Sequence, residues 1–235
     1  MTADGYTPMM PPDDVERIAQ WHARGESLAR SEAADGPQTF EYLGLTLVVP
    51  PEVMPITGVS HTLGGAVLAE VRDGERVLDM GTGSGVNGIL AATKGATVIA
   101  VDINPYAVEA ARANAERNGV ADRMDVRDGD VFSTIDGRFD LIVFDPPFRW
   151  FKPRDVREMA STDENYRAMT EFFRGARDRL SSSGRMLIFF GTSGDIAYLR
   201  SLADANGFRT EVVAESAVTR DEVTTRYYTF KMTPA

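Results

Sequence analysis

The sequence predicts a doubly wound α/β fold whose central sheet is mostly parallel. Three observations support this prediction. Short apolar segments of strand length alternate with helical segments from about residue 63 onward. The first of these strands is followed by a glycine-rich loop, at the place where such sheets bind ligands. The length of 235 residues, with 43% hydrophobic and 26% charged residues, fits one α/β domain with a modest appendage.

The first 60 residues are expected to form this appendage. They contain a loose arm with three prolines (1–12), a helical segment (13–34) and two β-rich segments (40–43 and 45–49). The two β-rich segments flank Gly44, which predicts a hairpin outside the main sheet. We expect residues 1–60 to cover or recognise the substrate of a core formed by residues 61–235.

The core is expected to contain seven strands, with an antiparallel pair at the end of the chain. The expected strands are 76–80, 97–101, 124–127, 139–144, 186–190, 208–214 and 226–232. The expected helices are 63–71, one from the glycine loop to 93, 105–117, 165–180 and 195–205. Asn104 and Pro105 supply the cap and the first-turn proline of the helix 105–117. Gly184 is expected to mark the end of the helix 165–180.

Composition excludes several kinds of site. The chain has no cysteine and only two histidines, so we expect neither disulfides, thiolate nucleophiles nor a metal site. The formal net charge of −10 disfavours broad binding to nucleic-acid phosphates. No apolar run has the length of a membrane span and the first residues lack a secretory pattern, which predicts a cytoplasmic protein without membrane contact. The sequence does not predict an oligomeric state.

A glycine-rich loop follows the first core strand. Gly81, Gly83 and Gly85 allow a tight turn and let the backbone approach a ligand without a Cβ atom in the way. The N-terminus of the next helix adds free N–H groups. Asp102 ends the second strand, where its carboxylate can accept hydrogen bonds from ribose hydroxyls.

The same loop also matches a dinucleotide-binding pattern. Residues 83–88 read G-x-G-x-x-G, so a nicotinamide or flavin cofactor is an alternative. The register disfavours this alternative, because the first glycine after the strand is Gly81. Asp79 disfavours it further, since a carboxylate at the strand exit would repel a pyrophosphate. That carboxylate could instead accept hydrogen bonds from an amino-acid ammonium, directly or through water.

The segment Val77–Gly85 resembles the first motif of class I S-adenosylmethionine-dependent methyltransferases. The resemblance implies a Rossmann-like methyltransferase core with S-adenosylmethionine as cofactor. It assigns the methionine part to Asp79 and the glycine loop, the ribose to Asp102 and the adenine to Ile103. Residues 129–132 are similar to the family's third-strand motif, where Asp130 would meet the adenine amino group. The implied cofactor residues are Asp79, Gly81, Thr82, Gly83, Gly85, Asp102, Ile103, Asp130 and Val131.

A second loop follows the strand 139–144 and reads Asp-Pro-Pro-Phe. Its two prolines fix φ and remove two N–H donors, which leaves backbone carbonyls as acceptors in a stiff loop. Asp145 and a carbonyl such as that of Pro146 can hold an amino or amide nitrogen, while Phe148 offers a flat face for a planar substrate. The loop resembles the (Asp/Asn)-Pro-Pro-(Tyr/Phe) signature of nitrogen methyltransferases, which implies catalytic roles for Asp145, Pro146 and Phe148.

The motifs are most similar to those of glutamine N-methyltransferases that act on release factors. Those enzymes carry Asn where this chain has Asp145, and they have a larger N-terminal domain. Base-amino methyltransferases of RNA or DNA also carry Asp-Pro-Pro-aromatic loops, and residues 149–157 combine four basic residues and one acidic residue with aromatics. A protein or small-molecule nitrogen is the leading acceptor, and an RNA nucleobase amino group is the alternative. A nicotinamide-dependent oxidoreductase and a silent cofactor-binding subunit remain rivals.

Overall fold

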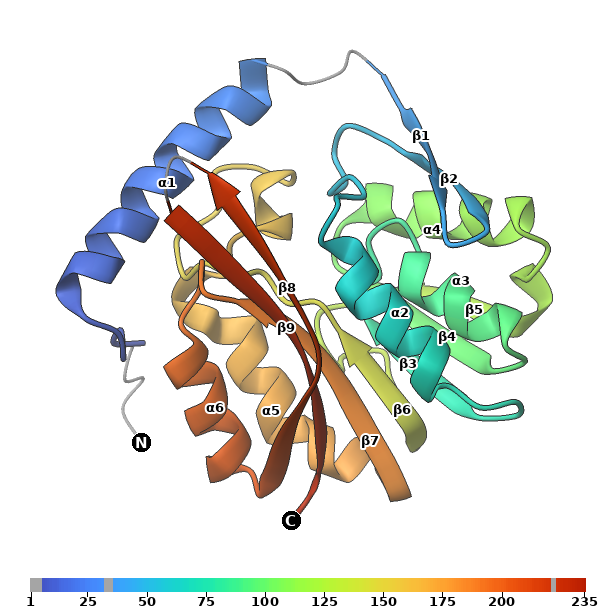
Figure 1. The fold of residues 1–235 in the computed structure, drawn as a ribbon. Coiled ribbons are helices and arrows are strands. Elements are labelled where there is room, and N and C mark those ends of the chain that lie inside the picture. The colour runs from blue at the N-terminus through green and yellow to red at the C-terminus, as the bar shows by residue number, and fades with distance from the viewer. Residues whose placement is uncertain (1–5, 32–35, 221–222) are drawn as a thin grey trace.

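A seven-stranded sheet runs through the centre of the computed structural model, which describes residues 6–31, 36–220 and 223–235, with side chains of the first helix described up to residue 25 (Figure 1). The spatial order of the strands is β5-β4-β3-β6-β7-β9-β8. Their bounds are β3 Arg76–Met80, β4 Thr97–Asp102, β5 Met124–Asp128, β6 Phe139–Phe144, β7 Leu180–Gly191, β8 Phe208–Arg220 and β9 Val223–Pro234. Neighbours pair in parallel from β5 to β7, whereas β9 is antiparallel to both β7 and β8.

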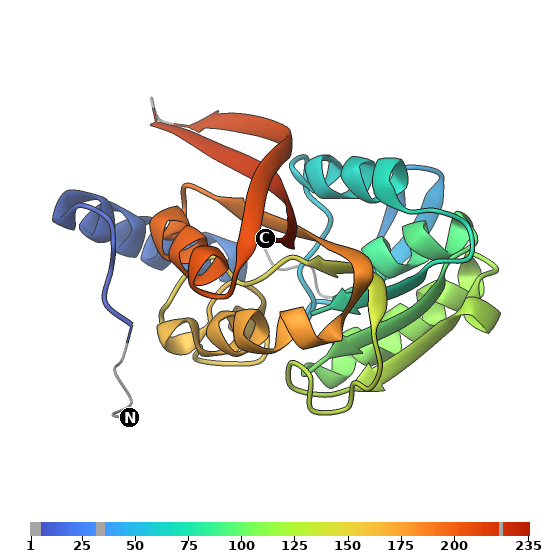
Figure 2. The same ribbon diagram turned by 90° about the horizontal axis from the view of Figure 1, so that it is seen from below.

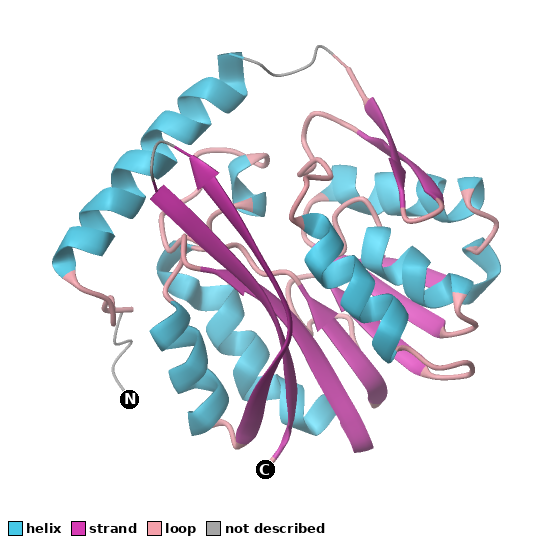
Figure 3. Ribbon diagram, in the orientation of Figure 1, coloured by secondary structure: helices cyan, strands magenta, loops and turns pink. Residues whose placement is uncertain are grey.

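Helices cover both faces of this sheet, which gives three layers (Figure 3). One face carries α2 (Ser60–Glu70), α3 (Val86–Thr93) and α4 (Pro105–Arg117), and the other carries α5 (Arg167–Arg179) and α6 (Ile196–Ala205). Short 3-10 helices occupy Ala121–Arg123, Glu158–Ala160 and Glu164–Tyr166. No helix in the described part of the chain is long and apolar enough to cross a membrane. The predicted doubly wound sheet with an antiparallel end is confirmed.

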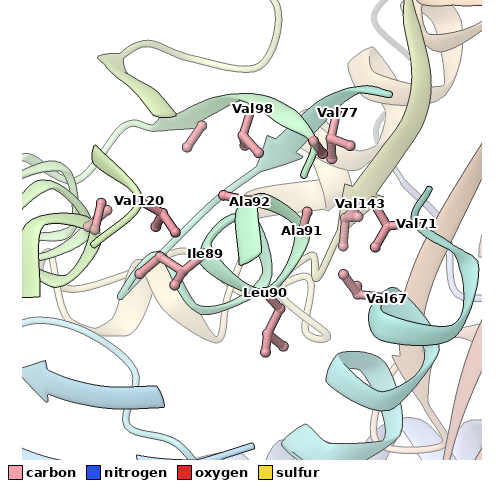
Figure 4. Close-up of a cluster of buried hydrophobic side chains, with 14 of the residues drawn as sticks. Val67, Val71, Val77, Ile89, Leu90, Ala91, Ala92, Val98, Val120 and Val143 are labelled. Carbon is pink, nitrogen blue, oxygen red and sulfur yellow. The ribbon is translucent and has the colours of Figure 1, made fainter. Parts of the chain in front are cut away.

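Two apolar clusters hold the layers together, because successive residues of each strand point to opposite faces. In β3, Val77 packs with α2 and α3, whereas Leu78 packs with α5 and α6. Figure 4 shows part of the first cluster, in which Val67 comes from α2, Leu90 from α3, and Val77, Val98 and Val143 from the strands β3, β4 and β6. A core on both faces fixes the register of every strand, and therefore the height at which each strand-end loop leaves the sheet.

The N-terminal segment forms one helix and a separate hairpin. Helix α1 spans Pro12–Ser31, and the hairpin consists of β1 (Gln38–Tyr42) and β2 (Leu45–Val49). The predicted residues 32–34 of the helix lie outside the described part. The hairpin pairs with no strand of the main sheet, as predicted, and packs on α4. In Figure 1 it lies on the side of the molecule opposite α1.

The described part of the predicted loose arm is not loose. The hydroxyl of Tyr6 and the backbone N–H of Met9 both donate to the Asp195 carboxylate, at 2.8 and 2.7 Å. The Tyr6 ring also lies edge-on to Tyr166 and Tyr198. Prolines and polar residues suggested a loose segment, but the half-buried ring of Tyr6 and the carboxylate of Asp195 anchor it to the core.

Gly184 does not end a helix, which corrects a second prediction. Helix α5 ends at Arg179 and β7 begins at once with Leu180, six residues before the predicted start of that strand. The serines 181–183 suggested a loop, yet they lie in a strand whose pairing with β6 is interrupted by a bulge. A Cβ atom on Gly184 would come within 2.7 Å of the Phe139 carbonyl, so the glycine permits this close approach.

The last two strands are also longer than predicted. They extend as a twisted hairpin well beyond the sheet, and its far end approaches α1 (Figure 1, Figure 2). Ser216 faces Tyr227 and Arg220 faces Val223 in this extension. Most residues of this extension are polar, and its apolar residues are isolated, so the hydrophobic pattern alone did not predict a strand here.

Candidate active site

One large cavity lies beyond the carboxyl ends of β3, β4 and β6, where the strand order reverses. Its volume is about 1320 Å³. Ten of the twelve predicted site residues line it: Gly81, Thr82, Gly83, Asp102, Ile103, Asp130, Val131, Asp145, Pro146 and Phe148. The two predicted loops are therefore brought together, although 60 residues separate them in the chain.

The glycine loop adopts a conformation that favours glycine. Gly81 and Gly83 have φ angles of +64° and +55°, and a Cβ atom on either would point at open space or distant side chains. The N–H of Gly83 donates to the Asp102 carboxylate at 2.8 Å. Backbone geometry, and not crowding, is what excludes larger residues here. The loop can therefore lie close to a ligand along its whole length.

Gly85 has a different role from the one predicted. It does not line the cavity, and its φ of +87° starts α3. A Cβ atom there would lie 3.0 Å from the backbone of Ala111 in α4. The missing side chain lets α3 and α4 pack closely, so Gly85 supports the loop from behind instead of contacting a ligand.

Asp79 lies beneath the loop and does not line the cavity. One of its oxygens accepts hydrogen bonds from the Thr82 hydroxyl at 2.6 Å and from the Gly88 N–H at 2.8 Å. Burial raises the pKa of Asp79 to about 6, against the lowering effect of these two bonds. The described contacts make Asp79 a brace of the loop, and its predicted contact with an ammonium stays a prediction.

The residues predicted to hold the ribose and the adenine line the cavity together. Both Asp102 oxygens accept backbone N–H groups, from Gly83 and from Asn104, which fixes the carboxylate toward the cavity. Ile103 is 44% exposed although it is a large apolar residue, and its side chain forms a flat apolar wall. Asp130 is held by an ion pair with Arg167 at 2.9 Å, so its carboxylate already has a partner.

Asp145 directly follows β6 and presents its carboxylate to the cavity. The side chain is solvent-accessible, but the surrounding protein leaves little bulk water to stabilise a charge. Burial of this kind raises the pKa of Asp145 to about 7, and repulsion from Asp79 adds to the shift. No hydrogen bond among the described residues ends on this carboxylate. It is therefore available to a ligand, and a cation nearby would lower its pKa.

Phe148 is held in place from two sides. Its ring packs against Phe189, Phe190 and Tyr227, with centroids 5.7, 4.9 and 6.1 Å away. Its backbone carbonyl accepts a hydrogen bond from the Tyr166 hydroxyl, which in turn accepts the N–H of Asp195 at 2.9 Å. The loop of residues 145–148, called the acceptor loop below, is thus linked through Tyr166 to Asp195. Asp195 is also the residue that anchors the N-terminal segment.

The basic segment after this loop is folded against α1. Glu158 is 1% exposed, and its carboxylate contacts Arg154 at 2.8 Å and His22 at 3.0 Å. The hydrogen bond from Arg154 holds the pKa of Glu158 below its ordinary value. The His22 ring also stacks on Phe151. These contacts place Trp21 and Arg24 of α1 in the cavity wall.

Three supporting residues were missed in the sequence. Tyr166 and Asp195 lie far from both motifs along the chain, and no local pattern marks the tyrosine. Asp195 was recognisable only as the residue before α6, which it caps through the N–H of Tyr198. Asn114 bonds to the carbonyl of Ser84 inside the glycine loop. The two residues are 30 positions apart in the chain, and no local pattern predicts their contact.

The sequence matches the family described as methyltransferase small domain over residues 63–217. The chain belongs to this family. It is 33% identical to ribosomal RNA small subunit methyltransferase C of Chromohalobacter salexigens over 83% of this chain and 56% of that protein. It is 30% identical to the release factor glutamine methyltransferase of Neisseria gonorrhoeae over 92% of this chain and 84% of that protein. The chain thus spans little more than half the length of the first relative.

Solved methyltransferases share the fold. A putative S-adenosylmethionine-dependent methyltransferase from Streptococcus mutans superposes with a TM-score of 0.63 over 84% of this chain and 56% of that one, at 14% identity. S-adenosylmethionine is the cofactor of these enzymes, and the described residues fit it. The positive-φ glycines leave room for it, Asp102 and Ile103 suit a nucleoside, and the Asp145 carboxylate, which lines the cavity, suits a cation.

Proposed function

We propose that the protein is an S-adenosylmethionine-dependent methyltransferase that methylates an amide or amino nitrogen of a protein or small-molecule acceptor. The observation that carries this proposal is the Asp145 carboxylate, which faces the cavity between the glycine loop and Phe148 without a hydrogen-bond partner among the described residues. A carboxylate that accepts hydrogen bonds is complementary to an N–H group. A hydride-transfer enzyme has no evident need for it.

When bound, S-adenosylmethionine supplies a methyl group on a positively charged sulfur. Ionised Asp145 accepts a hydrogen bond from the acceptor N–H and turns the nitrogen lone pair toward that methyl group. The carbonyl of Pro146 holds a second N–H, and the Phe148 ring supports the flat face of the acceptor. During the transfer, the acceptor nitrogen would take the methyl group and S-adenosylhomocysteine would be the leaving group. Asp145 would hold the N–H and would accept its proton, or pass it to water.

The proposed role of Asp145 predicts that the methyltransferase activity depends on pH. Asp145 must be ionised to accept the N–H, and its pKa in the free protein is about 7. Activity at low acceptor concentration should therefore rise as pH increases from 6 to 8. Bound cationic cofactor stabilises the carboxylate, so the midpoint should be lower when the cofactor is saturating.

Methyl transfer tests the proposal directly. Transfer of a labelled methyl group should be screened against release factors, a metabolite pool and RNA, with mass spectrometry of the product. Asp145→Ala should reduce turnover at least 100-fold, as expected for loss of an orienting group in the transition state, and should leave S-adenosylhomocysteine affinity nearly unchanged. Full activity of the Asp145→Ala variant would contradict the assignment of the acceptor loop to the active site.

An RNA nucleobase amino group is the second candidate acceptor. The similarity to a ribosomal RNA methyltransferase and the basic residues after Phe148 support it. The overall charge of −10 weighs against an extended RNA contact. If RNA becomes labelled in the screen, and if the Asp145→Ala variant no longer labels it, then RNA is the acceptor class.

A further inference from the structure

The wall of the cavity carries arginines from three separate segments. Arg149 directly follows the acceptor loop, Arg220 ends β8 and Arg24 lies in α1, and all three line the cavity wall. The chain as a whole has 35 acidic and 25 basic residues, so a local gathering of arginines is not a consequence of composition. A binding role would explain it.

Two of these arginines have no partner in the described part of the chain. No ion pair or side-chain hydrogen bond joins Arg24 or Arg220 to another described residue. Two carboxylates of the cavity wall have partners elsewhere: Asp130 pairs with Arg167, and both oxygens of Asp163 accept N–H groups at the start of α5. Asp145 and Glu164 also line the cavity. Among the described residues, none of these carboxylates forms an ion pair with Arg24 or Arg220, so these two guanidinium groups are available to an anion.

Tyr227 adds a hydrogen-bonding hydroxyl at the same place. Its ring stacks on Phe189 at 5.9 Å and lies 6.1 Å from Phe148, and it lines the cavity. A Cβ atom on Gly191 would lie 2.7 Å from this ring, so the glycine lets Tyr227 lie flat on β7. Burial raises the pKa of the Tyr227 hydroxyl, and the positive charges of Arg149 and Arg220 act in the opposite direction.

The backbone of Arg149 is fixed as well. Its N–H donates to the Ser161 carbonyl at 3.2 Å, and its carbonyl accepts the N–H of Asp163 at 2.8 Å. Phe148 and Arg149 therefore belong to one braced segment. A group bound by Arg149 would have a set position relative to an acceptor lying on Phe148, which is the requirement for orienting a nitrogen.

We propose that Arg149, Arg220 and Tyr227 form an anion-binding subsite for the methyl acceptor, with Arg24 of α1 completing it. The acceptor then carries a phosphate or carboxylate group beside its planar nitrogen. Arginine binds both groups through paired N–H donors, and the tyrosine hydroxyl adds a third. This inference rests on the proposed function, because it names the acceptor of that same site.

Anion binding can be measured apart from catalysis. The protein, saturated with S-adenosylhomocysteine to fill the cofactor's own carboxylate position, is titrated by calorimetry with inorganic phosphate or with succinate at constant ionic strength. At least one of the two should bind, and the tighter one identifies the anion of the acceptor. Arg220→Gln and Arg149→Gln should each weaken that binding about tenfold, the loss expected for one charge-assisted contact.

Arg209→Gln is the matched control. Arg209 is an exposed arginine on the same strand β8, outside the cavity, and its substitution changes the net charge equally. It should leave anion binding unchanged, and Arg220→Lys should retain part of it. Absence of binding, or equal losses in Arg209→Gln and Arg220→Gln, would overturn the subsite. Failure of S-adenosylhomocysteine itself to bind would instead contradict the proposed function, and titration without it would still test the arginines.

Discussion

Asp145 and Asp79 are two acids that oppose each other's ionisation. Burial raises the pKa of each, and the charge of Asp79 raises that of Asp145 further. The Asp79 carboxylate accepts two hydrogen bonds, which stabilise its charged form, whereas the Asp145 carboxylate accepts none from the described residues. The free protein therefore holds an acid that a cationic ligand and an N–H donor would stabilise in its charged form.

This arrangement makes stability depend on pH. The folded protein keeps a proton on Asp145 up to about pH 7, whereas the unfolded chain releases it near 3.8, so stability falls as pH rises between these values. Asp145→Asn should therefore melt at the same temperature as the parent at pH 4 and several degrees higher at pH 8. Because the carboxylate faces solvent in the cavity, we expect a gain of only about 1–2 kcal/mol. An equal melting temperature at pH 8 would contradict the shifted pKa.

At the residue scale, ten of the twelve residues predicted from the sequence line the cavity, among many others. Asp102 and Asp145 can be predicted because the first ends a strand and the second directly follows one. The sequence pattern does not reveal that Gly85 faces Ala111. Tyr166 was not found, because a hydroxyl that bonds to a backbone carbonyl leaves no trace in sequence spacing.

The segment between β6 and α5 is the most constrained part of the fold. Asn165 and Tyr166 both have positive φ, at 57° and 51°, which costs free energy for residues with a side chain. Asp163 offsets this cost by capping α5 through the N–H groups of Ala168 and Met169. The result is that the Tyr166 hydroxyl reaches the Phe148 carbonyl.

Tyr166→Phe tests this constraint. The change leaves the Phe148 carbonyl and the Asp195 N–H without their partner, which should cost about 1–3 kcal/mol of unfolding free energy. We also expect the acceptor KM to rise while S-adenosylhomocysteine affinity stays the same. Tyr198→Phe is the control, because it removes a neighbouring hydroxyl that contacts Thr170 instead. Identical KM values in both variants would reduce Tyr166 to a purely structural residue.

Asn114 joins three elements from its buried position in α4. Its side chain bonds to both the N–H and the carbonyl of Val48 in β2 and to the carbonyl of Ser84 in the glycine loop. Asn114→Ala should lower the unfolding free energy by about 2–4 kcal/mol and weaken S-adenosylhomocysteine binding. Asn118→Ala should destabilise the hairpin without affecting that binding, because Asn118 contacts Thr46 but not the loop. Unfolding curves and calorimetry of the two variants provide the comparison.

Elements with strong periodicity were predicted closely, as β3 and β6 show by their identical bounds. The start of β7 was wrong because three serines masked a bulged strand. Residues 215–220 of β8 and 223–225 of β9 were missed for a similar reason, since their alternation is weak where the strands leave the core. In each case tertiary pairing decided the structure and local composition did not.

Across the whole molecule, the cavity is enclosed from both sides by the N-terminal segment. Helix α1 contributes Trp21 and Arg24, and residues 53–60 contribute the opposite wall next to the glycine loop. The expected lid of residues 1–60 stays a prediction, but both of its parts border the predicted site. Removal of this segment should therefore alter both cofactor and acceptor binding.

Cofactor binding tests the central claim most directly. Calorimetry with S-adenosylhomocysteine and with NAD⁺ separates a methyltransferase cavity from a dinucleotide site. We predict saturable one-to-one binding of S-adenosylhomocysteine, no binding of NAD⁺, and at least a tenfold loss in Asp102→Ala, as expected when a charged hydrogen-bond acceptor is removed. Binding of NAD⁺ in preference to S-adenosylhomocysteine, or unchanged affinity in Asp102→Ala, would contradict the account.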